Sequence, residues 1–204
     1  MRVVSGEAKS RRLQSVRGDT TRPITDRVKT SLFNILMSRV EDTCFLDLFA
    51  GTGAVGIEAL SRGAREAVFV EREERAAITI RRNLQATGLA DRAQVVRKDV
   101  FRFIASYQGS PFDIVYVAPP QYRGLWARTL QALDTSRLIA PGGLAVAQIH
   151  PKEYEPLALS HLVLSDQRKY GSTLLCFYQT PDSTTAENPS SSGSPGGPAP
   201  NGSQ

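Results

Sequence analysis

Three glycines at G-x-G-x-x-G spacing, Gly51, Gly53 and Gly56, follow an apolar run that contains a single carboxylate, Asp47. An alanine-rich segment of helical character comes directly after them. This order is typical of a buried parallel strand that leads into a tight turn and a helix N-terminus. A glycine turn lets a ligand lie against backbone N–H groups, because no side chain stands between them. The pattern therefore predicts a site for a nucleotide-like ligand and leaves its identity open.

Two ligands compete for this turn. An NAD-type dinucleotide would set its pyrophosphate on the glycines and its ribose on an acid about 20 residues further on, a role that Glu71 fits. S-adenosylmethionine needs the same ribose acid, but it carries a cationic amino group and a sulfonium instead of phosphates. Asp47 would attract those charges and repel a pyrophosphate. Asp99, at the end of the third expected strand, would accept from the adenine amine while Val100 packs on the ring.

Three carboxylates after three successive strands favour S-adenosylmethionine over NAD, although each one alone is equally well explained as a helix N-cap. The cofactor site predicted in this way comprises Asp47, Phe49, Gly51, Gly53, Gly56, Glu71, Arg72, Asp99 and Val100.

Strands and helices alternate around these residues. The expected strands are residues 43–49, 66–71, 93–98, 112–117 and 144–149, and the expected helices are residues 54–62, 73–87, 100–107 and 124–133. Near-continuous apolar strands in such an alternation predict a parallel sheet with helices on both faces, an α/β fold. The run Pro141-Gly142-Gly143 is expected to be a turn. Residues 161–169 and 172–178 are joined by Tyr170-Gly171 alone, so they should form a terminal antiparallel hairpin.

The first 40 residues carry nine lysines and arginines against three acidic residues. A basic segment beside a balanced core suggests a polyanionic partner such as nucleic acid. Residues 1–24 are interpreted as an ordered basic extension. Thr25 or Asp26 should cap a helix with Val28 and Leu32 on its apolar face, while Arg27 and Lys29 point toward solvent or substrate. The predicted organisation is a basic extension and capping helix over 1–40, a core domain over 41–180 and a disordered tail over 181–204.

Composition limits the alternatives further. At 204 residues, 41% of them hydrophobic, the chain suffices for one α/β domain, and its longest apolar runs are too short to span a membrane. Cys44 and Cys176 lie in apolar strand-like runs, which favours buried thiols in a reducing compartment. Two isolated histidines predict no metal site. We therefore expect a soluble, cytoplasmic protein, monomeric and without metal.

The segment 47–56, the pair Pro119-Pro120 after the fourth strand and the closing hairpin resemble a class I methyltransferase. The N-terminal run, from Val3-Val4-Ser5-Gly6-Glu7 through Arg22-Pro23-Ile24-Thr25-Asp26-Arg27-Val28-Lys29 to Leu36, is similar to the RsmD family. These bacterial enzymes methylate the exocyclic N2 of a guanine in 16S ribosomal RNA. The resemblance extends from Arg2 to about Gln179.

This resemblance implies a Rossmann-like, seven-stranded sheet of order 3-2-1-4-5-7-6, S-adenosylmethionine contacts from Gly51, Gly53, Glu71 and Asp99, and 16S ribosomal RNA or a small-subunit particle as partner. The RNA-binding residues that we expect in the basic segment are Arg11, Arg12, Arg22, Thr25, Arg27 and Lys29.

The chain departs from the family after the fourth strand, where relatives carry Asp or Asn, then Pro-Pro, then Phe or Tyr. Here the sequence is Ala118-Pro119-Pro120-Gln121-Tyr122, our candidate catalytic residues. A guanine amine is a poor nucleophile, and two acceptors for its N–H groups would aim its lone pair at the methyl group. Ala118 offers no acceptor. The Pro119 carbonyl remains, Gln121 could supply an amide oxygen, and Tyr122 could stack on the base.

Losing one such acceptor typically costs ~10²–10³ in rate. Two functions therefore stay open. The first is a guanine-N2 RNA methyltransferase with an altered amine site. The second is a catalytically impaired, S-adenosylmethionine-binding protein that binds ribosomal RNA or assists ribosome assembly on the same fold.

Overall fold

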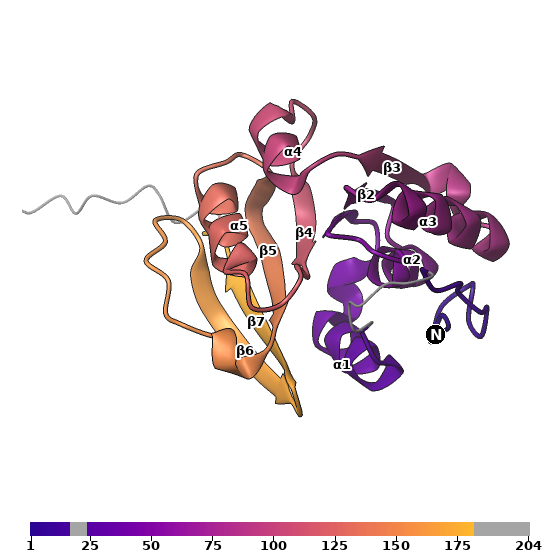
Figure 1. Ribbon diagram of the computed structural model, residues 1–204, viewed down its shortest axis with the longest axis horizontal. Helices are drawn as coiled ribbons and strands as arrows, with labels where there is room; N and C mark the ends of the chain where they lie inside the picture. Colours follow the sequence, from indigo (N-terminus) through magenta and orange to yellow (C-terminus); the bar gives the residue numbers. More distant parts are fainter. Residues whose placement is uncertain (17–23, 182–204) are drawn as a thin grey trace, which may run out of the picture.

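The computed structural model describes residues 1–16 and 24–181. Seven strands form one sheet of order β3-β2-β1-β4-β5-β7-β6 (Figure 1). In chain order they are β1 (Cys44–Leu48), β2 (Glu66–Glu71), β3 (Ala93–Arg97), β4 (Phe112–Val117), β5 (Ile139–Ile149), β6 (Val163–Tyr170) and β7 (Thr173–Gln179). The strands β1 to β5 pair in parallel, and β7 is antiparallel to both β5 and β6. The strand order expected of a class I methyltransferase is confirmed.

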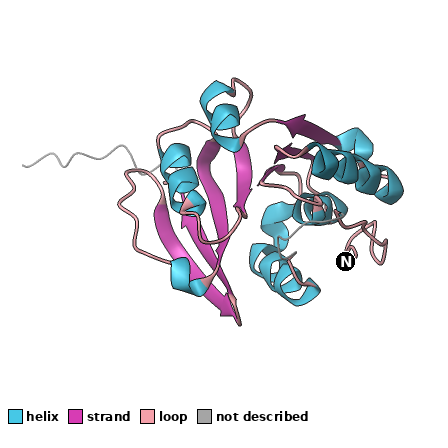
Figure 2. Cartoon of the chain, viewed as in Figure 1, coloured by secondary structure: helices cyan, strands magenta, loops and turns pink. Residues whose placement is uncertain are grey.

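Helices cover both faces of the sheet (Figure 2). They are α1 (Asp26–Leu36), α2 (Ala54–Ser61), α3 (Glu74–Thr87), α4 (Val100–Ser106) and α5 (Leu125–Asp134), with short 3₁₀ turns η1 (Met37–Val40), η2 (Ala90–Arg92) and η3 (Pro151–Glu153). Apolar residues of α1, α2 and α3 pack with Phe45, Phe69 and Tyr116. Those of α4 and α5 pack with Leu46 and Val115. Neighbouring residues of one strand thus serve opposite cores, as the two-residue period of a strand requires.

The sequence-based element bounds agree closely with the structure except near β5. Residues 141–143, expected to be a turn before the fifth strand, lie inside β5, which begins at Ile139. The pairing with β4 shifts there, from Phe112 opposite Ile139 to Ile114 opposite Leu144. Gly142, at φ 71°, accommodates the irregularity in a backbone region that favours glycine. The Pro-Gly-Gly run therefore makes a bulge within an ordered strand.

The first 16 residues form an ordered extension, which we call the N-terminal arm. The Val3 N–H donates to the Arg11 carbonyl at 3.0 Å, the Ser10 N–H returns to the Val3 carbonyl at 2.9 Å, and the Leu13 N–H reaches the Met1 carbonyl at 3.1 Å. Val3 and Leu13 are buried in the core cluster that contains α1 and α2. The arm is therefore packed onto the domain. The division at residue 40 stays a prediction, and the tail expected beyond residue 181 lies outside the described residues.

Among the residues described, none of the helices has the length and apolar character needed to cross a membrane. In the same part of the chain, His, Cys, Asp and Glu side chains form no cluster of three that could hold a metal ion. Cys44 and Cys176 are buried free thiols.

Candidate active site

A cleft of about 980 Å³ lies at the carboxyl edge of β1, β2, β3 and β4. It gathers most of the residues that the sequence predicted for the cofactor and for catalysis. These are Asp47, Phe49, Gly51, Glu71, Arg72, Asp99, Val100, Ala118, Pro119, Pro120 and Gln121. Parallel strands present their carboxyl ends at one edge, which explains why segments distant in sequence converge here.

Asp47 is a buried carboxylate near the end of β1, with 2% of its surface exposed. One of its oxygens, Oδ2, accepts from the Gly56 N–H in α2 at 3.0 Å. Burial raises the pKa of the Asp47 carboxyl to about 8, while the Gly56 hydrogen bond lowers it and the charge of Glu71 raises it. A protonated carboxyl in this position loses its proton readily when a positive group comes next to it.

The glycine turn is shaped by backbone conformations that most side chains avoid. Phe49, Gly51 and Gly53 all have positive φ, at 61°, 57° and 76°. Phe49 is the notable member, because a bulky residue in the left-handed region is strained, and such strain concentrates at functional sites. Gly56 has a different reason to be glycine, since a Cβ there would lie 2.4 Å from Cε1 of Phe69. Gly53 and Gly56 thus shape the turn without lining the cleft.

Glu71 ends β2 and is fastened to the turn. Its Oε2 accepts from the Gly51 N–H at 2.9 Å, and its Oε1 accepts from the Glu73 N–H at 2.8 Å. Each carboxylate oxygen has further lone pairs, so the group can still accept hydroxyl hydrogen bonds from a ribose. The position of Glu71 in the cleft agrees with the role predicted for it.

Asp99 is the N-cap of α4. Its Oδ1 accepts from the N–H groups of Phe101 at 3.0 Å and Arg102 at 3.2 Å. The simple capping explanation is therefore correct for this oxygen. Asp99 nevertheless lines the cleft together with Val100, which is 4% exposed, so capping and ligand contact are compatible.

The segment after β4 is divided between the cleft and the solvent. Ala118 and Pro119 face the cleft, and Gln121 is exposed at its rim. Tyr122 is 66% exposed and does not line the cleft. Its N–H donates to Glu153 Oε1 at 2.5 Å, and its ring lies 5.4 Å from that of His150. Tyr122 is therefore exposed outside the lining of the cleft, and its stacking on a target base stays a prediction.

Sequence reasoning missed several polar residues of the cleft, among them Tyr116 on β4 and Gln148 on β5. The Tyr116 hydroxyl donates to Gln148 Oε1 at 2.6 Å. Tyr116 is 2% exposed and was taken for an ordinary strand residue. The sequence feature that could have revealed this pair is Gln148 itself, a polar residue near the carboxyl end of the otherwise apolar run Leu144–Ile149 in β5.

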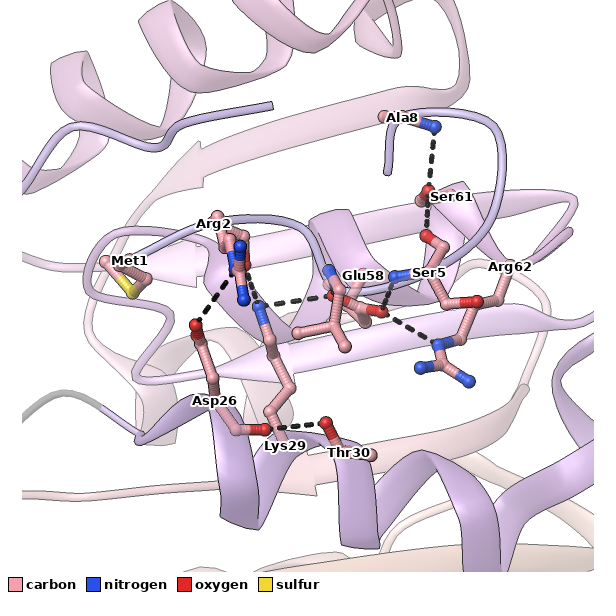
Figure 3. A network of polar contacts seen from close by, with 12 residues as sticks. Met1, Arg2, Ser5, Ala8, Asp26, Lys29, Thr30, Glu58, Ser61 and Arg62 are labelled. Carbon is pink, nitrogen blue, oxygen red and sulfur yellow. Dashed lines mark hydrogen bonds and ion pairs between the residues drawn. The ribbon is translucent and has the colours of Figure 1, made fainter. Parts of the chain in front are cut away.

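Glu58 of α2 fastens the N-terminal arm to the domain (Figure 3). Its carboxylate is fully buried and accepts from the N–H groups of Val4 at 2.7 Å and Ser5 at 2.9 Å. It also forms ion pairs with Lys29 Nζ at 3.2 Å and Arg62 Nε at 2.8 Å. Four donors on one carboxylate satisfy its charge inside the protein. We call this group of residues the Glu58 network.

The structure corrects the expectation that Lys29 points toward solvent or substrate. Its side chain is fully buried between the arm and α2, and besides Glu58 its ammonium reaches the Arg2 carbonyl at 2.5 Å (Figure 3). Lys29 lies off the apolar stripe of α1, as predicted, but the arm covers that side of the helix. A lysine buried in this way positions the arm and cannot contact RNA directly.

The other basic candidates fit a surface role. Arg11, Arg12 and Arg27 are exposed. Thr25 is exposed as well, and its Oγ1 caps α1 by accepting from the Val28 N–H at 3.3 Å. Arg22, the remaining candidate, lies outside the described residues.

Known proteins place this chain in a family. The family model described as "Conserved hypothetical protein 95" matches residues 1–179. The chain belongs to this family. It is 37% identical over 182 residues to "Putative rRNA methyltransferase YlbH" of Bacillus subtilis, which covers 88% of this chain and 98% of that protein. Its identity to "Ribosomal RNA small subunit methyltransferase D" of Escherichia coli is 34% over 179 residues, 88% of this chain and 89% of that protein.

A solved structure shows the same fold. "Putative methyltransferase yhhF" from Escherichia coli superposes with a TM-score of 0.78 at 34% identity, over 89% of this chain and 98% of the other. The resemblance to the RsmD family expected from the sequence is confirmed.

Proposed function

We propose that this protein is an S-adenosylmethionine-dependent methyltransferase that modifies the exocyclic N2 of a guanine in 16S ribosomal RNA. The observation that carries the proposal is one cleft that is lined by Asp47, Glu71 and Asp99 around the glycine turn and by Pro119 after β4. Membership in a family whose named relatives are ribosomal RNA methyltransferases supports it.

The donor and acceptor groups of the cleft fit this cofactor. Asp47 is buried with one backbone donor and a raised pKa, which is the environment of a carboxylate prepared for a cationic neighbour. A Cβ on Gly51 would come no closer than 3.9 Å to the surrounding atoms, so the backbone there is open to a ligand. Glu71 would hold the ribose and Asp99 the adenine amine. A pyrophosphate would lie against Glu71 and Asp99, and its negative charge would leave the buried Asp47 carboxyl protonated and without a cationic partner, which disfavours NAD.

When bound, the cofactor supplies a methyl group on a positively charged sulfur. The chain itself must orient the amine and exclude water around it. The amine lone pair forms the new N–C bond as the C–S bond breaks and its electron pair returns to sulfur, and one amine proton passes to solvent. Pro119 lines the cleft, and its carbonyl would accept one N–H and so help to direct the lone pair.

Exposed cations of the arm and of the first turn of α1 are proposed to bind RNA. Arg11, Arg12 and Arg27 are exposed, and such guanidinium groups bind phosphate oxygens through paired hydrogen bonds. The Glu58 network holds the arm in place beside α1 and α2, so Arg11 and Arg12 belong to an anchored segment.

Incubation of the protein with labelled S-adenosylmethionine and unmodified 30S particles or 16S ribosomal RNA tests the proposal. We expect label in a guanine nucleoside, identified as N2-methylguanosine after digestion. Glu71→Ala should weaken cofactor binding by about 10- to 150-fold, the equivalent of one charge-assisted hydrogen bond, and Glu155→Ala, at an exposed site outside the cleft, serves as its control. Tight RNA binding without any methyl transfer would contradict the proposal and favour an assembly role.

A further inference from the structure

The proposed reaction asks for two acceptors on the target amine, and the segment after β4 supplies one. The Pro119 carbonyl can take one N–H. Ala118, the neighbouring residue that faces the cleft, ends in a methyl group. Because the guanine amine has its lone pair delocalised into the ring, an amine with one N–H left unpaired would be poorly aligned for attack. A second acceptor should therefore be sought among the residues around Ala118.

The strand register places Gln148 next to Ala118. The strands β4 and β5 are parallel, with Tyr116 opposite Val146 and Val117 opposite Ala147, so the next residues along, Ala118 and Gln148, are neighbours across the pair. Tyr116 and Val146 belong to the core cluster beneath the cleft, and two residues further along each strand the side chains point to the same face. Ala118, Tyr116 and Gln148 all line the cleft.

Tyr116 fixes the orientation of the Gln148 amide. Its hydroxyl donates to Gln148 Oε1 at 2.6 Å. Burial, reinforced by the nearby charge of Asp47, raises the pKa of Tyr116 well above its ordinary value, so the phenol keeps its proton and remains a donor. A carbonyl oxygen has two lone pairs, and this bond uses one of them. The other remains for a second donor, on an oxygen that the tyrosine both positions and polarises.

Resting on the function proposed above, we propose that the side-chain carbonyl of Gln148 is the second acceptor of the target amine, with Tyr116 as its positioning residue. Gln148 thereby takes the part that Ala118 cannot play. Gln121 is the competing candidate, but its side chain is exposed at the rim, where ordering it would cost conformational entropy. Gln148 is partly buried and is already ordered by its hydrogen bond with Tyr116, so little further conformational entropy is lost when it binds the amine.

Single-turnover methyl transfer with saturating cofactor and 30S particles tests this assignment. Gln148→Met keeps the side-chain volume and removes the acceptor, and it should lower the rate by about 10²–10³-fold. Cofactor and RNA dissociation constants should stay within about twofold of wild type, since the amide acts on the reacting amine. Tyr116→Phe should lower the rate by a smaller factor, roughly 5- to 10-fold, the equivalent of one neutral hydrogen bond.

Two further variants separate the acceptor from general effects on the fold. Gln167→Met removes a partly buried amide of β6 that does not line the cleft. The Nε2 of this amide lies 3.4 Å from Cys176 Sγ, and its loss should leave the rate unchanged. Ala118→Asn, introduced into Gln148→Met, restores an acceptor beside Pro119 and should recover at least tenfold of the lost rate. That rescue would not occur if Gln148 were merely structural.

The outcomes distinguish this inference from the function on which it rests. Wild-type transfer to guanine N2 with an undiminished rate in Gln148→Met would overturn the role of Gln148 and leave the proposed function standing. A large loss in Gln121→Met instead would assign the acceptor to Gln121. Absence of transfer by both wild type and Ala118→Asn, with cofactor bound, would overturn the two proposals together.

Discussion

Glu58→Gln should destabilise the folded protein by roughly 3–5 kcal/mol, because it leaves the charge of Lys29 buried without its ionic partner. Both side chains of this pair are fully buried, 3.2 Å apart, so water cannot replace the lost interaction. Arg62 is 19% exposed and can turn toward solvent, and an amide oxygen can still accept from one of the two arm N–H groups. The magnitude is therefore dominated by the lysine.

For a domain of this size, such a loss lowers the melting temperature by roughly 6–20 °C. Thermal unfolding followed by circular dichroism measures it, together with urea unfolding for the free energy. Asp42→Asn is the matched control, since its pair with Arg65 at 3.5 Å is exposed and its loss should shift the midpoint by no more than ~2 °C.

A double variant tests the physical reason. Adding Lys29→Met to Glu58→Gln removes the unpaired charge and should recover a large part of the lost stability, although each single change is destabilising. A midpoint for Glu58→Gln within ~2 °C of wild type would refute the reasoning. So would a double variant whose loss is the sum of the two single losses.

Four further predictions concern Asp47, Gly56 and the arm. Burial raises the pKa of Asp47 from its ordinary 3.8 to about 8, so a cationic cofactor should bind with release of a proton. The affinity for the cofactor should therefore rise by up to about tenfold per pH unit as the pH increases toward 8. Calorimetry that finds no pH dependence, or the same dependence in Asp47→Asn, would contradict this. Since the folded state holds that proton more tightly than the unfolded chain, the carboxyl should also lower the stability of the ligand-free protein as pH rises from about 4 through 8. Gly56→Ala should cost ~1–3 kcal/mol in urea unfolding, because the new Cβ would clash with the Phe69 ring at 2.4 Å, and an unchanged midpoint would show that the ring can move aside. Replacing Arg11 and Arg12 by alanine should weaken RNA binding and leave cofactor affinity unchanged. The slope of the logarithm of the RNA-binding constant against the logarithm of salt concentration should become shallower by about one unit per lost phosphate contact. An unchanged slope would show that the RNA binds elsewhere.

The fold and the meeting of the strand-end carboxylates in one cleft could be predicted because their signals are local. Apolar runs, glycine spacing and a carboxylate after each strand, such as Glu71 and Asp99, are read directly from the chain. The parallel arrangement then brings those carboxylates to one edge without further information. Ambiguity remained where a short motif has two local uses, as at Asp99, which caps a helix and also lines the cleft.

The features that were missed depend on pairings between distant parts of the chain. Lys29 was expected to point toward solvent or substrate because its partner, Glu58, lies on another helix. The sequence around either residue gives no signal of the ion pair. Gln148 became visible as a candidate only after the register of β4 and β5 set it beside Ala118. Tyr122, a candidate for stacking on the target base, is exposed in a loop with φ at 59°, and its stacking role stays a prediction.

The anchoring of the N-terminal arm also bears on the order in which the protein folds during synthesis. The arm is made first, yet the side chains that hold Val4, Ser5, Ala8 and Gln14 follow 53 to 69 residues later. At ~5–20 residues per second, the arm must wait roughly 3–14 s for its partners to be synthesised. We therefore expect the arm to dock only after α2 and α3 are made, although β4 to β7 are synthesised later still. On stalled nascent chains, the Val4 and Ser5 amides should be unprotected from hydrogen exchange when the exposed chain ends before residue 58 and protected when it extends past residue 83. Protection in the shorter chains would contradict this order. An incomplete chain without α2 and α3 would then carry Arg11 and Arg12 on an arm that nothing yet holds.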